Sequence, residues 1–358
     1  MIVFAVLTAI WSTALFEFTS RSRWASFLSL ALIIALYSLR WETGTDWGSY
    51  FEFFDSFNSS DRFLVVFEPG YILLVKLVKS IWNNYSFYLL VHSALVWIFI
   101  WEVNKRLSPR PIISLVLVLC YFYPYLGSER QLIAIAFCWI SLIFVISREP
   151  IKFYTSLAVA VSFHVSAVIF LPVYLISRPK FGKSTLALLG LFSVIVLSLD
   201  IFAPLMAVLE ASTSMLGKDY GSYSENISAQ SFYTTGLLKK IAVISLIIIF
   251  DKQLSREAFY RQYLIVRNII LYGFVLHALF GSSIPTFVGR ASLYFNPFEC
   301  ILFTFILASI KSLIPRTIFC CLLIGYSYIY LYRSLQIYYD LFFPYCSVFE
   351  TACRANIY

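Results

Sequence analysis

Charged residues are scarce in this chain of 358 residues: they make up 13% of it, whereas apolar residues make up 60%. A soluble domain carries about 25% charged and about 45–50% apolar residues, so the composition excludes a soluble globular fold. The period-two alternation of a membrane β-barrel is also absent. Apolar runs of about 15–20 residues recur instead, which is close to the length that crosses ~30 Å of hydrocarbon. We therefore predict an all-α, polytopic integral membrane protein.

Several other features are absent. No basic residue precedes the first apolar run and no small-residue cleavage site follows it, so we interpret the start as a spanning helix and not as a signal peptide. The cysteines show no zinc or haem spacing, and we expect neither a metal nor another cofactor. Five cysteines lie in apolar runs, and the other two, Cys346 and Cys353, lie near the end of the chain. The sequence leaves open whether these two pair.

Hydropathy predicts about twelve transmembrane helices in one transmembrane domain, residues 1–358. The segment 151–177 is divided at His164 because basic sequences flank it on both sides, and two crossings place both flanks on one side of the membrane. We see no internal repeat. The predicted helices are 2–18, 24–39, 84–101, 111–125, 131–147, 151–163, 165–177, 185–201, 236–250, 264–280, 291–310 and 313–333.

The positive-inside rule orients these helices. With both termini outside, the cytoplasmic loops hold most of the basic residues, including Arg23 and Lys105. The net charge of +8 then reflects this sidedness, and we expect no nucleic-acid partner. Two long segments lie outside: an outer loop, 40–83, with an interfacial helix that begins near the Glu-Pro-Gly at 68–70, and a second loop, 202–235. Loops of this length are usually functional or disordered.

A set of polar side chains collects at the outer boundary. A single arginine or lysine at a helix end usually extends to lipid headgroups, and a lone histidine is usually a helix cap. Arginine and lysine side chains that extend to headgroups are, however, expected mainly on the cytoplasmic side. Their accumulation at the outer boundary therefore favours a binding or catalytic site there. The set comprises Arg40, Asp46, Glu129, Arg130, His164, Lys239, Lys240 and Arg290.

These residue types suit a diphosphate. Arginine offers planar, bidentate donors and lysine a compact charge, and the interfacial position suits a diphosphate attached to a lipid. His164, Asp46 and Glu129 are candidate catalytic bases for activating a hydroxyl, in that order of preference. The aromatic-rich loops suit the faces of sugars.

Six short motifs, in this order, resemble the EpsG family of bacterial polysaccharide proteins, which overlaps with the Wzy-type O-antigen polymerases. They are RWETGTDWGSY (40–50), FEPGY (67–71), ERQLIAIA (129–136), FHVSAVIFLPVY (163–174), GRASLYF (289–295) and FPY (343–345). The resemblance implies a fold related to the C-type membrane glycosyltransferases. It also points to Arg40, Asp46, Arg130, His164 and Arg290 as site residues.

The resemblance implies a glycosyltransferase, an O-antigen or polysaccharide polymerase that acts in lipopolysaccharide biosynthesis. Such an enzyme sits in the bacterial inner membrane and joins repeat units linked to undecaprenyl diphosphate at the periplasmic face. Arg40, Arg130, Arg290, Lys239 and Lys240 would bind the substrate diphosphate, and the loop 202–235 would act as a lid or acceptor platform. The lipid-linked oligosaccharide and membrane lipid are the expected partners; binding of a chain-length regulator stays open.

Three alternatives also stay open. A flippase for lipid-linked sugars would need charges deep in several helices, and only His92 and Glu299 are predicted to be deep. An O-antigen ligase would differ from a polymerase only in its acceptor. An O-acetyltransferase should place its reactive histidines towards the cytoplasm, whereas His164 is predicted outside.

Overall fold

A computed structural model describes residues 2–18, 23–57, 67–182, 227–280 and 285–350, together with 184, 185 and 188. Helices dominate these ranges, and no β-strand is formed within them. Four described helices are long and apolar enough to cross a membrane by length and composition: Tyr85–Leu107, Glu129–Ser147, Tyr260–Phe280 and Leu313–Gln336. Six shorter apolar helices accompany them. The all-helical membrane architecture is confirmed, whereas the count of twelve crossings is not.

The chain divides into two compact units. Unit 1 comprises residues 1–171 and 303–358, and unit 2 comprises residues 172–302. The α-helices of unit 1 are α1 (Ile2–Leu15), α2 (Arg23–Ser38), α3 (Trp47–Asp55), α4 (Pro69–Ile81), α5 (Tyr85–Leu107), α6 (Pro111–Phe122), α7 (Glu129–Ser147), α8 (Pro150–Phe163), α16 (Leu313–Leu335) and α17 (Tyr339–Phe342). Short 3₁₀ turns lie at Phe16–Phe18, Tyr123–Tyr125, Val165–Phe170 and Gln336–Tyr338.

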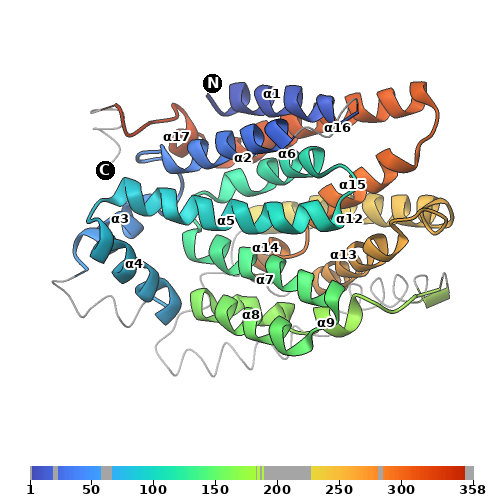
Figure 1. The fold of residues 1–358 in the computed structure, drawn as a ribbon, viewed down its shortest axis with the longest axis horizontal. Coiled ribbons are helices and arrows are strands. Elements are labelled where there is room, and N and C mark those ends of the chain that lie inside the picture. Colours follow the sequence, from blue (N-terminus) through green and yellow to red (C-terminus); the bar gives the residue numbers. More distant parts are fainter. Residues whose placement is uncertain are drawn as a thin grey trace. The chain divides into compact units, whose positions relative to one another are not determined.

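In unit 1 the longer helices pack as successive neighbours. Helix α1 packs on α2 and α6, α2 packs on α5, α5 packs on α7, and α7 packs on α8 (Figure 1). The short helices α3 and α4 contact this row through α5, and α4 also contacts α8. The outer loop predicted at 40–83 therefore contains two helices, of which α4 was predicted and α3 was not.

Local chemistry accounts for the helix ends that matter for the site. Proline occupies the first turn of α4, α6 and α8, where its missing N–H costs nothing. The Asn84 side chain caps α5 by accepting a hydrogen bond from the Phe87 amide at 3.0 Å. Helix α8 ends at Phe163, because His164 adopts an extended backbone before the 3₁₀ turn Val165–Phe170. The predicted break at His164 is confirmed.

The end of the chain pairs with the segment that follows α2. The Trp41 amide donates to the Cys346 carbonyl at 2.9 Å, and the Val348 amide donates to the Leu39 carbonyl at 2.9 Å. The buried Tyr345 hydroxyl donates to the Leu36 carbonyl at 2.8 Å. Cys346 is disulfide-bonded, whereas Cys353 lies outside the described residues. The residues after α17 thereby hold the beginning of the outer loop in place.

Unit 2 contains α9 (Val173–Ile176), α12 (Ile227–Leu254), α13 (Tyr260–Phe280), α14 (Pro285–Ser292) and the start of α15 (Phe298–Ser309), which continues into unit 1. Most of the predicted helix 185–201 and of the predicted loop 202–235 lies outside the described residues. Two predictions were wrong: residues 227–235 are helical and not loop, and the predicted helix 291–310 is two helices, because α14 ends at Ser292 and α15 begins at Phe298.

Candidate functional site

Two glycine turns bring the outer loop against the start of α7. Gly44 has φ +110°, a backbone conformation that favours glycine. A Cβ on Gly127 would lie 2.5 Å from both the Asp46 amide nitrogen and the Thr45 hydroxyl. The segments 44–46 and 126–128 therefore approach each other closely through their backbones.

At this junction a buried ion pair joins Arg40 and Glu129. Their side chains are 2% and 0% exposed, and Nη2 of Arg40 lies 2.6 Å from Oε1 of Glu129. Nη1 of Arg40 donates to the Thr43 carbonyl at 2.8 Å, so the guanidinium also holds its own loop. The hydroxyl of Tyr85 donates to Oε1 of Glu129 at 3.1 Å.

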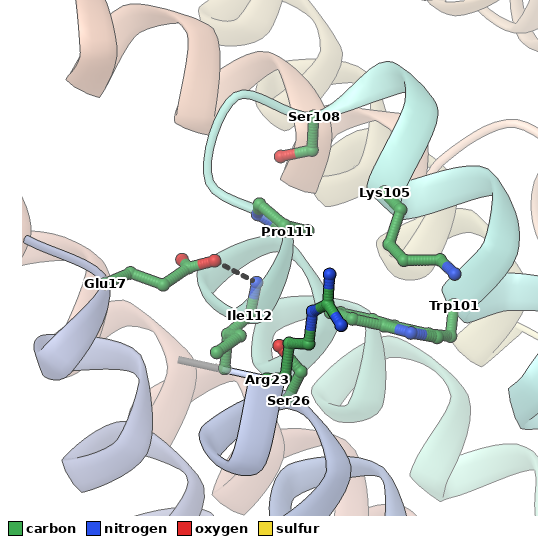
Figure 2. A pocket seen from close by; sticks show the side chains of 8 residues that line it. All are labelled: Glu17, Arg23, Ser26, Trp101, Lys105, Ser108, Pro111 and Ile112. Carbon is green, nitrogen blue, oxygen red and sulfur yellow. Dashed lines mark hydrogen bonds between the residues drawn. The ribbon is translucent and has the colours of Figure 1, made fainter. Parts of the chain in front are cut away.

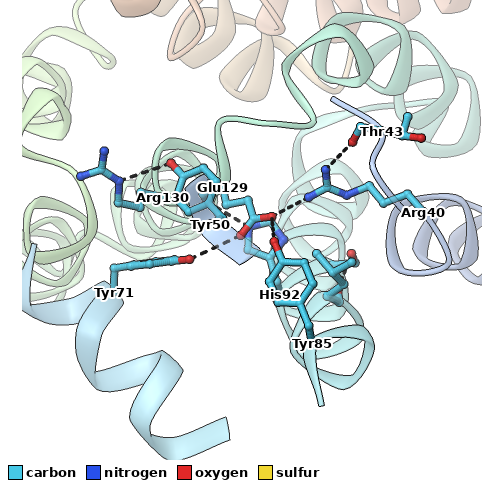
Figure 3. Close-up of polar contacts among 10 residues, drawn as sticks. Arg40, Thr43, Tyr50, Tyr71, Tyr85, His92, Glu129 and Arg130 are labelled. Carbon is cyan, nitrogen blue, oxygen red and sulfur yellow. Dashed lines mark hydrogen bonds and ion pairs between the residues drawn. The ribbon is translucent and has the colours of Figure 1, made fainter. Parts of the chain in front are cut away.

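Two further groups complete the environment of Glu129. The Tyr71 hydroxyl lies 3.5 Å from Oε2, and Nε2 of His92 lies 3.0 Å from the Glu129 backbone carbonyl (Figure 3). The network thus links the outer loop, α4, α5 and α7. Since a buried carboxylate needs its charge balanced and its oxygens bonded, this placement favours a supporting role for Arg40 and Glu129 over contact with substrate.

Arg130 follows Glu129 directly but points away from the Glu129 carboxylate (Figure 3). Its side chain is 22% exposed and forms an ion pair with Glu68, which precedes α4. Nε donates to the Tyr50 hydroxyl at 3.3 Å, and the guanidinium lies over the Phe67 ring, 4.7 Å from its centroid. Nη2 makes no hydrogen bond to a residue that the structure describes. Arg130 is therefore oriented by its neighbours and still accessible.

Tyr50 and Asp46 lie one turn apart at the start of α3. The Tyr50 amide donates to the Asp46 carbonyl at 3.2 Å. Burial raises the pKa of the Tyr50 phenol to about 12, although the nearby Arg130 opposes this rise. The Tyr50 side chain is buried, whereas Asp46 is exposed. Among Asp46, Glu68 and Glu129, Asp46 is thus the carboxylate most open to solvent.

His164 lies near the same end of unit 1. A Cβ on Gly70 would meet the Ser162 hydroxyl at 2.4 Å, so the start of α4, next to Glu68, packs on the end of α8, next to His164. Nδ1 of His164 accepts from the Ser166 amide at 3.3 Å and lies 2.7 Å from the Ser166 hydroxyl. Because a backbone N–H can only donate, the neutral imidazole carries its proton on Nε2. This geometry favours His164 as a donor.

The other predicted site residues belong to unit 2. Lys239 forms an ion pair with Glu299 at 3.0 Å, and their side chains are 28% and 2% exposed. Nζ of Lys240 donates to the Asn296 side chain at 2.7 Å. Arg290 is exposed and lies in the last turn of α14, so it does not open a helix as predicted. Lys239 and Lys240 lie several turns into α12, because this helix begins at Ile227 and not at the predicted residue 236.

Five residues whose side chains contact Glu129 or Arg130 through polar groups were not among the predicted site residues: Tyr50, Glu68, Tyr71, Tyr85 and His92. Glu68 and Tyr71 belong to the FEPGY motif, which was the available signal for them. Tyr85 and His92 lie one and eight residues after the cap Asn84 in an apolar helix, where nothing in the sequence separates them from interfacial aromatics. Among the described residues, no group of three or more His, Cys, Asp or Glu side chains is placed to hold a metal.

Comparison with known proteins gives one result. The model of the EpsG family matches residues 23–347, nearly the whole chain, and this family includes Wzy-type polymerases. No curated protein and no solved structure matches. The match includes every residue of the Arg40–Glu129 pair and of the Arg130 environment. The chain is a membrane protein of polysaccharide biosynthesis that belongs to the EpsG family.

Proposed function

We propose that the protein is a polysaccharide polymerase, a membrane glycosyltransferase that joins lipid-diphosphate-linked repeat units. The family match supports the polymerase class. The observation that carries the proposal to particular residues is Arg130: an accessible guanidinium at the start of a candidate span, oriented by Glu68, Tyr50 and Phe67. Planar donors of this kind suit the paired oxygens of a diphosphate.

The proposed reaction is a displacement at a sugar carbon. A hydroxyl of the acceptor sugar attacks the anomeric carbon of the donor chain, and a new C–O bond forms there. The bond from that carbon to the diphosphate oxygen breaks, so the diphosphate leaves with its lipid. The hydroxyl proton passes to a base. Undecaprenyl diphosphate is the lipid carrier that we propose.

The structure suggests how the roles divide. Arg130 holds the donor diphosphate and stabilises its charge as it leaves, and His164 adds a hydrogen bond from Nε2. Asp46 is our candidate base, because it is the most exposed of the three carboxylates Asp46, Glu68 and Glu129. Arg290, Lys239 and Lys240, which belong to unit 2, remain proposed diphosphate-binding residues.

Two observations support an outer, periplasmic site. The chain end pairs with residues 39–44, which contain Arg40, and Cys346 in this segment is disulfide-bonded. Since disulfides persist in oxidising compartments, the Arg40 end of unit 1 is expected to face the oxidising side. In a bacterial inner membrane that side is the periplasm.

The test is to replace Arg130, His164 and Arg290 singly with alanine in cells and to separate surface polysaccharide on a gel. Loss of polymerisation should leave a single repeat unit on lipid A-core in place of a ladder. Arg333→Ala is the matched control, because Arg333 is an exposed arginine in the last turn of α16. Absence of even a single repeat unit would indicate a flippase. Normal ladders in all three variants would overturn the site assignment.

A further inference from the structure

A cavity of about 350 Å³ lies at the other end of α5 from the Arg130 environment (Figure 2). Its walls come from the end of the 3₁₀ turn after α1, the start of α2, the end of α5 and the start of α6. Helix α5 has 23 residues, which corresponds to about 35 Å. The cavity and the Arg130 environment are therefore separated by roughly the thickness of the hydrocarbon core.

Two cations and a tryptophan line this cavity. Arg23 makes no hydrogen bond or ion pair with a residue that the structure describes. Lys105 pairs with Glu102 at 2.6 Å and lies 5.9 Å from the centre of the Trp101 ring. In Figure 2, Arg23, Lys105 and Trp101 lie on one side of the cavity and Glu17 on the other. The charged lining residues are thus Arg23, Lys105, which is paired with Glu102, and one carboxylate, Glu17.

Glu17 does not neutralise these cations. Its carboxylate accepts the backbone N–H of Ile112 at 3.0 Å and that of Ile113 at 3.4 Å, so it caps the start of α6. Its own backbone carbonyl accepts a hydrogen bond from Arg110 at 2.5 Å. An anionic ligand that enters the cavity therefore meets Arg23 as its main ionic partner and Lys105 as a cation that it shares with Glu102. The single carboxylate also disfavours a highly charged polyanion.

The surface beside the cavity is apolar and exposed. Trp24, Phe27 and Leu28 follow Arg23 on α2 and are 80%, 66% and 50% exposed. In a helix of a membrane protein such side chains contact acyl chains. The cavity volume is at the lower end of the range of about 300–1,000 Å³ for small-ligand sites, so a small phosphate-bearing headgroup fits it. The acyl chains of the same lipid would then lie along this apolar surface.

We propose that this cavity binds the phosphodiester headgroup of an anionic phospholipid, on the membrane face opposite the Arg130 environment. The positive-inside orientation makes this face the cytoplasmic one. Basic residues at that surface attract anionic lipids, and here two of them share one cavity with an indole wall. The proposal does not depend on the polymerase activity.

The test uses the full-length protein in detergent, with phosphatidylglycerol as the probe and phosphatidylcholine as the zwitterionic comparison. Native mass spectrometry measures the apparent dissociation constant. We expect Arg23→Ala and Lys105→Ala each to weaken phosphatidylglycerol binding about fivefold and to leave phosphatidylcholine binding unchanged. Lys152→Ala is the matched control, because Lys152 also pairs with a glutamate three residues before it but lies outside the cavity. This control should bind like the wild type.

Three outcomes would overturn the proposal. Wild-type lipid binding in the Arg23→Ala/Lys105→Ala double variant would show that the cavity is not the site. An equal loss in Lys152→Ala would show that general surface charge and not this cavity attracts the lipid. Displacement of phosphatidylglycerol by inorganic phosphate at similar concentration would assign the cavity to a soluble anion instead.

Discussion

Removal of one partner of the Arg40–Glu129 pair tests whether these residues support the site or perform its chemistry. Glu129→Gln leaves the Arg40 charge buried, and Arg40→Met leaves the Glu129 charge buried. Breaking a buried pair in this way typically costs about 3–5 kcal/mol of the free energy of unfolding. The present pair belongs to this class because its side chains are 2% and 0% exposed. Nε of Arg40 also lacks a hydrogen-bond partner among the residues that the structure describes.

The double variant Arg40→Met/Glu129→Gln removes both charges of this buried pair. The glutamine oxygen still accepts from Tyr85, which in the native protein lies 3.1 Å from Oε1 of Glu129. The main hydrogen bond lost is the one from Arg40 to the Thr43 carbonyl, and a bond of this kind is worth about 1 kcal/mol. The double variant should therefore be more stable than either single variant.

The stability assay is unfolding of the purified protein in mixed micelles by increasing fractions of a denaturing detergent, followed by circular dichroism. Lys152→Ala serves as the control, because exposed ion pairs contribute little or nothing measurable. The polysaccharide ladder of the same variants reports on chemistry. We expect the double variant to recover part of the ladder that the single variants lose.

Either of two results would refute this reasoning. If the losses of the two single variants simply add in the double variant, the pair is not coupled. If the double variant recovers stability but makes no ladder, Glu129 or Arg40 takes part in the chemistry directly, and Glu129 returns as a candidate base.

Three other predictions follow from single contacts. Gly127→Ala should abolish the ladder while the protein still reaches the membrane, because the new Cβ would lie 2.5 Å from the Asp46 amide nitrogen. Gly325→Ala is the control, because a Cβ at that position meets nothing within 4 Å. Equal ladders in the two variants would contradict the close approach at Gly127. Tyr345→Phe should lower the free energy of unfolding by about 1 kcal/mol, because it removes the hydrogen bond from the Tyr345 hydroxyl to the Leu36 carbonyl. An unchanged free energy in the same micelle assay would show that this hydrogen bond does not hold the chain end against α2. The pKa of Tyr50 is raised to about 12, so its neutral form stabilises the fold fully below pH 10, and that contribution is lost as the pH rises from 10 to 12. The free energy of unfolding should then fall by about 2 kcal/mol more in the wild type than in Tyr50→Phe over this interval, and parallel pH profiles would contradict the assignment.

Hydropathy predicted the positions of most helices because apolar runs and their breaks are local signals. It failed where a helix continues beyond its apolar part. Helix α5 runs on to Leu107 through Glu102 and Lys105, and α12 starts at Ile227, before its apolar run. It also missed α3, in which Gly48, Ser49 and Glu52 interrupt the aromatics, so that the sequence is typical of an irregular loop.

The sequence identified Arg40, Glu129 and Arg130 as candidate site residues, but it did not predict their pairing. Arg40 and Glu129 are 89 residues apart, and the sequence offered several carboxylates to each arginine. Which pair forms depends on the contact of Gly44 with Gly127 and on the packing of α4 against α8. These are tertiary contacts, so a motif read along the chain identifies the participants without assigning partners.

The positions of Arg40 and Arg130 show that an arginine at a membrane boundary has a third role besides extending to headgroups and binding substrate. Arg40 is buried and neutralises Glu129, the first residue of α7. A carboxylate at that position also interacts favourably with the positive end of the helix dipole. Because consecutive helical residues point about 100° apart, fixing Glu129 inward directs Arg130 to another side of α7, where Glu68 and Tyr50 orient it. The buried pair thus determines the direction of the accessible arginine, which explains how the neighbouring residues Glu129 and Arg130 come to have different partners.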